Sequence, residues 1–123
     1  MAVATVVYSP TTIAGHVKGK WTCHSSPSAT DIYIGFIPSV LMWWNVSDKD
    51  VIGIWSPAMA DATGISIAAA AAAIASAGIT PFTRITTPAS SGVTAVVGGT
   101  GFTIGTDANV QEASDVFEFI AFR

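Results

Sequence analysis

Short apolar runs, each closed by proline, glycine, serine or aspartate, are the feature that most limits what this chain can fold into. In order along the chain they cover residues 3–8, 17–24, 31–37, 39–46, 51–55, 94–97 and 102–104. Runs of this kind are typical of strands in a β-sandwich or barrel. In the first half of the chain their spacing is too short for the crossover helices of a parallel sheet, so a mainly β fold is predicted.

The size and composition indicate one domain that works against other chains. The 123 residues suit a single domain, in which residues 1–15 form either an N-terminal arm or the first strand. Only 11% of the residues are charged, whereas a typical soluble domain has about 25%, and serine and threonine supply much of the polarity. A surface with so few charges is expected to be covered by partner proteins.

Three further classes are not expected. The net charge is −3 and the five lysines and arginines are scattered, so the sequence predicts no nucleic-acid binding. The apolar stretch from Ile65 to Ile79 is mostly alanine and shorter than the ~20 apolar residues of a membrane helix. Residues 1–10 lack the features of a signal peptide.

Cys23 is the only cysteine, and we expect a buried thiol in a reducing compartment.

An alanine-rich stretch interrupts the β pattern. Six consecutive alanines span Ala68–Ala73, and alanine has the highest helix propensity of all residues. Gly78 follows at a position suited to a helix C-terminus, and Pro81 comes soon after. The pattern predicts one short helix over Ile67–Ala77; the alternative is an alanine-rich strand or extended arm.

The last strand and a tryptophan pair carry apolar residues on both faces. In the terminal strand from Val116 to Phe122 both faces are largely apolar, apart from Glu118 on one of them. This predicts a central strand covered on both faces, by its own domain or by a partner. Trp43 and Trp44 are adjacent, so on a strand they point to opposite faces. One fills the core; the other either packs under a loop or anchors an interface. We predict interface residues among Trp43, Trp44, Trp55, Phe117 and Phe119.

Catalytic and metal-binding patterns are weak throughout the sequence. His16, Cys23 and His24 do not have zinc-site spacing, and no nucleophile elbow is present. The glycine cluster at 98–101 lacks the lysine of a phosphate-binding loop. Asp48 and Asp50 share a turn but have few further ligands nearby for calcium. The sequence therefore predicts a protein that is not an enzyme and has no cofactor and no metal.

A residue pattern between Lys20 and Arg123 resembles the capsid decoration (cement) proteins of tailed bacteriophages. Its elements are Asp31–Val40 with its Ile-Gly-Phe core, Trp44-Asn45-Val46, Trp55, Met59-Ala60-Asp61, Gly78–Pro81, Gly101–Asp107, Asn109-Val110 and the terminal Ala121-Phe122-Arg123. The resemblance implies a mainly β, jelly-roll-like β-sandwich, here with one short Ala-rich helix. It also implies no catalytic residues.

The resemblance further implies a place in the virion. Such proteins form dimers or trimers on the outer capsid surface and bridge neighbouring major capsid proteins of the HK97-like fold. The chain would then be made in the cytoplasm of the host bacterium and work on the capsid. Three alternatives stay open at this point. One is another phage component, such as a tail or head–tail joining subunit. The second is a carbohydrate-binding β-sandwich that uses Trp21, Trp43, Trp44 and Trp55 as a stacking platform. The third, ranked last, is a small enzyme that uses His16 or His24.

Overall fold

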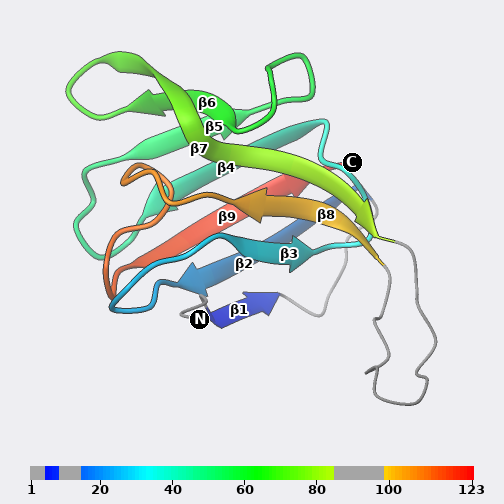
Figure 1. Ribbon diagram of the computed structural model, residues 1–123, viewed down its shortest axis with the longest axis horizontal. Coiled ribbons are helices and arrows are strands. Elements are labelled where there is room, and N and C mark those ends of the chain that lie inside the picture. Colours follow the sequence, from blue (N-terminus) through cyan, green and yellow to red (C-terminus); the bar gives the residue numbers. More distant parts are fainter. Residues whose placement is uncertain (1–4, 9–14, 85–98) are drawn as a thin grey trace.

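All regular elements in the described part of the chain are strands (Figure 1). The computed structural model describes residues 5–8, 15–84 and 99–123. The strands are β1 Thr5–Tyr8, β2 His16–Thr22, β3 Thr30–Tyr33, β4 Val40–Asn45, β5 Ile52–Trp55, β6 Thr63–Ile67, β7 Ala71–Arg84, β8 Gly99–Ile104 and β9 Val116–Phe122. The mainly β prediction is confirmed. Within these ranges no helix is long and apolar enough to span a membrane.

The strands form one antiparallel sheet that curls back on itself. Its order is β1-β2-β9-β4-β5-β6-β7-β8-β3. Strands β7, β8 and β3 lie over β4, β9 and β2, so the sheet makes two facing layers (Figure 1). The rings of Trp21 in β2 and Phe102 in β8 are 6.4 Å apart, although these strands are not neighbours in the sheet. The described strands are thus one continuous curled sheet, not two separate ones.

Strand β7 makes the bend between the two layers. Its first residues pair with β6 and its last residues pair with β8. The register with β6 shifts between Thr63 and Gly64, which pair with Ile79 and Ile74, so residues 75–78 are skipped. Within this skipped stretch Ala77 has a positive φ of 56°. Extra residues in one strand of a pair bend it and increase its twist, which carries β7 from one layer to the other.

The predicted helix over Ile67–Ala77 is wrong. Residues 68–70 form the turn between β6 and β7, and the alanines from Ala71 onward belong to β7. Burial in the sheet outweighs propensity here. Ile74 and Ile79 are buried in the core, which stabilises the fold by about 1.5–3 kcal/mol for each side chain. The helix preference of alanine over other ordinary residues is less than about 0.7 kcal/mol per residue, and a short isolated helix is marginal.

The core is built on β9, which pairs with β2 on one side and β4 on the other. This confirms its predicted central position. Phe117, Phe119 and Ala121 are fully buried on its inner face. The ring of Phe119 lies 5.5 Å from that of Trp21 and 5.6 Å from that of Phe102, which joins the two layers.

Two core tryptophans also hold the loop before β9. Trp21 Nε1 donates a hydrogen bond of 3.0 Å to the carbonyl of Val110, and Trp43 Nε1 donates one of 2.7 Å to the carbonyl of Asn109. Trp43 lies against Gly53, where any Cβ would overlap the indole ring. A glycine at this position is therefore required for the indole to lie flat on β5.

Two regions predicted from the sequence fall partly or wholly outside the described residues. The strand predicted at 94–97 lies outside them. In the N-terminal stretch of 15 residues, Thr5–Tyr8 form β1, which pairs with β2 at one edge of the sheet. Residues 1–4 and 9–14 lie outside the described part.

The two faces of β9 should respond differently to the loss of a phenylalanine side chain. Phe119→Ala should lower the free energy of unfolding by about 3–5 kcal/mol, because it leaves a cavity between the two layers. Phe122→Ala, at an exposed position of the same strand, should cost about 1 kcal/mol at most. Urea unfolding followed by tryptophan fluorescence measures both. An equal loss of unfolding free energy in the two variants would contradict the placement of Phe119, but not Phe122, in the core.

The strand conformation of the alanines can be tested at Ala72, which is exposed and pairs with Ser66. Ala72→Thr should raise the free energy of unfolding by up to about 1 kcal/mol, because β-branched residues favour strands. The same substitution in a helix would lower stability by several tenths of a kcal/mol. Ala72→Gly is the control and should lower stability in either conformation. Denaturant midpoints of the three proteins decide between a strand and a helix.

Candidate interaction surface

One face of the sheet carries apolar side chains in register across β9, β4, β5 and β6. We call it the outer face, and it consists of Val40, Met42, Trp44, Ile52, Ile54, Ile65, Ile67, Ile120 and Phe122. The pairing aligns Ile120, Met42, Ile54 and Ile65 in one row. The adjacent row runs from Glu118 through Trp44 and Ile52 to Ile67. None of the nine apolar side chains is buried in the structure.

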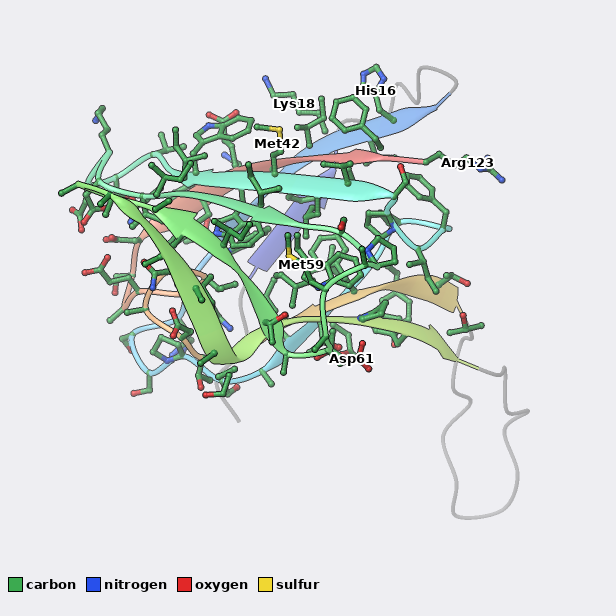
Figure 2. The ribbon with its side chains drawn as sticks, turned by 90° about the horizontal axis from the view of Figure 1, so that it is seen from above. His16, Lys18, Met42, Met59, Asp61 and Arg123 are labelled. Carbon is green, nitrogen blue, oxygen red and sulfur yellow. The ribbon has the colours of Figure 1, made fainter. Side chains whose placement is uncertain are left out.

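The outer face follows from strict alternation along the strands. In β4, Leu41, Trp43 and Asn45 are buried, and the residues between them are half-buried. Trp43 and Trp44 thus point to opposite faces, as predicted. Figure 2 shows Met42 on the same side of the molecule as His16 and Lys18, while Met59 lies between the two layers. The second apolar face of β4 therefore has no cover from within the described chain.

The exposure on this face is large for aliphatic residues. Ile52 is 46% exposed, Ile67 41% and Ile65 38%, and Phe122 is exposed to 39%. These four are among the six exposed large hydrophobic residues of the described chain. Single exposed hydrophobic residues are common, but a contiguous patch of this kind marks an interaction site.

A groove of about 470 Å³ opens on one end of the outer face. Its apolar lining comes from the tryptophan and two isoleucines of the outer face together with small residues of the adjoining turns, namely Trp44, Val46, Val51, Ile52, Ile67 and Ala68. Its polar lining is Asn45, Lys49, Asp50 and Glu118. The groove offers an apolar floor with charges of both signs at its rim.

Three lysines, the only ones in the sequence, border the outer face. Lys18 and Lys20 lie on β2, beside the row partners Ile120 and Glu118. Lys49 is in the turn that joins β4 to β5 and lines the groove. Lys18 Nζ lies 3.7 Å from Glu118 Oε2, and the two side chains are 56% and 35% exposed, so solvent screens this ion pair and it contributes little stability.

Four carboxylates gather at the end of the sheet near the turn after β4. Oxygen atoms of Asp48, Asp50 and Glu112 lie within 4.8 Å of one another at the surface. Asn45 Nδ2 donates to Asp115 Oδ2 at 3.0 Å and to Glu112 Oε2 at 3.5 Å. We call Asp48, Asp50, Glu112 and Asp115 the acidic cluster.

Crowding of like charges shifts the protonation of the acidic cluster. A hydrogen bond shared with the Asp115 side chain, together with the Asp115 charge, raises the pKa of Asp48 above its ordinary value. The pKa of Glu112 is raised by desolvation and then by the charges of Asp48, Asp115 and Asp50. The end of the molecule that carries the acidic cluster therefore has an excess of negative charge.

The acidic cluster alone does not define a metal site. It contains both aspartates considered from the sequence, Asp48 and Asp50. Together with Glu112 they form, among residues 15–83 and 99–123, a group whose oxygens could contact one cation. Exposed carboxylates often gather without a cation. We assign no metal here.

The raised pKa values predict how stability depends on pH. The folded protein holds these protons more tightly than the unfolded chain does, so the free energy of unfolding should fall as the pH rises through the carboxyl range toward neutrality. Asp48→Asn removes one of the repelling charges. It should raise the melting temperature at pH 7 and reduce the difference in melting temperature between about pH 4 and pH 7.

The control for this prediction is Asp61→Asn, an exposed aspartate outside the acidic cluster. Thermal unfolding of the wild type and both variants at the two pH values gives the comparison. If Asp61→Asn changes the pH dependence as much as Asp48→Asn does, general charge and not the cluster is responsible.

Most of the predicted interface residues belong to the core. Trp43, Trp55, Phe117 and Phe119 are fully buried, so their side chains are not available to a partner. Trp44 alone among the five predicted residues reaches the surface, where it forms the floor of the groove. The reason is the curl of the sheet, which covers the inner face that these four residues share.

The same burial bears on the carbohydrate-binding alternative. A sugar platform needs several exposed tryptophans on one face. Trp21, Trp43 and Trp55 are fully buried, and only Trp44 is half-buried at the surface. The four tryptophans therefore do not form the stacking platform that this function requires.

The candidate catalytic residues are dispersed. His16 and His24 lie at the start and just beyond the end of β2, eight residues or about 26 Å apart along an extended strand. The ring Nδ1 of His24 lies 3.3 Å from Ser25 Oγ and accepts a hydrogen bond of 3.2 Å from the backbone N–H of Ser26. Cys23 is buried, and desolvation raises the pKa of its thiol, which disfavours the reactive thiolate.

Sequence reasoning missed most residues of the outer face. The strand β6, with Ile65 and Ile67, was hidden inside the stretch interpreted as helical. Ile52, Ile54 and Met42 alternate with small or buried residues in predicted strands. This alternation could have indicated a second apolar face, but the pairing order of the strands was needed to join them into one surface.

Comparisons with known proteins do not identify the chain. No protein-family model matches it, and no match is found among curated proteins or among solved structures. A function for this chain is therefore argued from its surface and from the residue pattern of its sequence.

Proposed function

We propose that this chain is a structural protein of a bacteriophage particle. In this proposal it binds the outer surface of the capsid as a dimer or trimer and cements neighbouring major capsid proteins of the HK97-like fold. It acts without a cofactor, does not bind nucleic acid or membrane, and is not an enzyme. It is made in the cytoplasm of the host bacterium and works on the virion.

The outer face is the observation that carries this proposal. Nine apolar side chains in three registered rows lie uncovered on a rigid sheet. Leaving such a face in water is unfavourable by about 25 cal/mol for each Å² of apolar surface. A chain that keeps this face is expected to bury it against another protein chain, as a component of an assembly does.

A cementing role needs a surface that reaches the capsid, and the far edge of the sheet offers one. Strand β3 is the last strand in the order of the described sheet and so lies at its edge. Tyr33 in this strand is 39% exposed, and Ile37 just after it is 41% exposed. Copies that are joined to one another each present this edge, and several contacts of modest size can hold neighbouring capsid subunits together through avidity.

The resemblance to decoration proteins supports the same role. In this proposal the curled sheet with its two facing layers corresponds to the jelly-roll-like sandwich that the resemblance implies. Several of the resembling residues are structural here. Ile104 and Phe102 are buried in the core, and the carbonyls of Asn109 and Val110 accept the indole hydrogen bonds.

Capsid binding can be measured directly. Purified protein is mixed with heads lacking it, prepared from the phage whose genome carries the gene, and the mixture is sedimented. We expect binding that saturates at a fixed ratio to the major capsid protein, with Kd in the micromolar range or below. Cryo-electron microscopy of the decorated heads then locates the bound copies.

Two outcomes would contradict this function. Binding that never saturates, or no co-sedimentation with heads, removes the capsid as the partner. Density for the chain in the tail or at the head–tail junction of native particles would assign it to the alternative phage component instead.

A further inference from the structure

We propose that a second copy of this chain covers the outer face, in a two-fold symmetric dimer in which the two sheets cross at about a right angle. This inference deepens the homo-oligomer part of the proposed function, on which it rests, by naming the surface that joins the copies. The shape of the outer face and the charges along two of its sides support this dimer.

The outer face has the composition of a homodimer interface. From β4 to β6 the two central rows contain no charged residue, and the one charge of these rows on β9 is Glu118, beside Trp44. The largest side chain of the face, Trp44, lines the groove. Interfaces between identical subunits are more apolar than transient ones, and charged residues are depleted at their centres. Small alanines of β7 adjoin the face at Ala71 and Ala73, opposite Ile67 and Ile65, and permit close approach.

Charges of opposite sign lie along two adjoining sides of the outer face. Lys18 and Lys20 follow β2, which borders the face along the direction of the strands. Glu118 of β9 lies beside them and pairs with Lys18 at 3.7 Å, so this side keeps one positive charge in excess. The acidic cluster lies at the end of the strands, beside the turn from β4 to β5. Lys49 is the one cation of that turn, so the end stays negative overall. The two charged sides therefore meet at a corner of the face.

This arrangement is complementary to itself under one kind of two-fold rotation. In a two-fold dimer the same patch serves both copies, so each contact occurs twice. An axis along the diagonal of the face brings the lysine side of one copy onto the acidic cluster of the other, and the reverse. The same rotation crosses the strands of the two sheets at about 90°, which is one of the two established ways in which sheets pack face to face.

The partner lysines would also relieve the acidic cluster. Its carboxylates repel one another in the isolated chain, as the raised pKa of Asp48 and of Glu112 indicates. An opposite charge within about 4–6 Å favours the ionised form of a carboxyl group. Two such contacts per dimer fix the orientation of the copies more than they add affinity.

The size of the face sets the expected strength. The four strands of the outer face and the flanking strands β2 and β7 are about 4.8 Å apart, and the three rows of side chains are about 6.7 Å apart, which gives a contact area on the order of 500 Å². A standard specific interface covers about 800 Å² on each partner. We therefore expect a dimer that dissociates on dilution, with Kd in the micromolar range.

A charge swap tests the orientation. Variant one carries Lys18→Glu and Lys20→Glu, and variant two carries Asp48→Lys and Asp50→Lys. Sedimentation velocity at about 100 µM protein should show a dimer for the wild type and a monomer for each variant alone, a loss of affinity of about 10-fold or more. An equimolar mixture of the two variants should form dimers again, because every reversed side then faces its opposite.

The control variant is Asp61→Lys, which lies on the other side of the molecule from Lys18 and Met42 (Figure 2). It should dimerise like the wild type. Circular dichroism and thermal unfolding confirm that all variants fold. Ile52→Lys, at the centre of the outer face, should be monomeric alone and in every mixture.

The outcomes separate this inference from the proposed function. A wild type that stays monomeric at 100 µM, variants that still dimerise, or a mixture that stays monomeric overturns the dimer, even if the protein binds phage heads. A protein that dimerises and obeys the charge swap but does not bind heads keeps the dimer and loses the capsid function. Binding of wild-type monomer to heads through Ile52 would assign the outer face to the capsid and also overturn the dimer.

Discussion

The packing of Trp21 between its aromatic neighbours is the interaction on which the rest of the structure depends. Its indole stacks on Phe117 at 5.7 Å and on Phe119 at 5.5 Å, both from the adjacent strand β9, and meets the edge of Phe102 at 6.4 Å across the core. Aromatic pairs of this geometry contribute about 0.5–1.5 kcal/mol beyond the area that they bury. Since Phe102 comes from the opposite layer, this cluster makes closure of the curled sheet favourable.

Closure commits one face of the central strands to the core and leaves the other without cover. Residues that alternate with the buried set, such as Met42 and Trp44, have no second layer within the described chain to pack against. An ordinary antiparallel sheet fills such positions with polar residues. Here they are apolar, so the shortage of charged residues falls largely on the outer face, which we propose that another chain covers.

Much of the fold was accessible from the sequence because alternation and turn residues act locally. The central position of β9 and the opposed directions of Trp43 and Trp44 were predicted from the period of two. The alanine stretch was not, since its conformation is decided by Ile74 and Ile79 entering a core formed by distant strands. The interface prediction failed to separate buried from exposed aromatics for the same reason, because the direction in which the sheet curls is not encoded in any one strand.

The two indole hydrogen bonds to Asn109 and Val110 have a consequence for the motion of the loop before β9. Opening this loop would leave two buried N–H groups without acceptors, each at a cost of about 1–3 kcal/mol. The loop should therefore not fluctuate independently, and its backbone amides should exchange with solvent nearly as slowly as those of the core. An acidic surface segment thus shares the cooperativity of the aromatic interior.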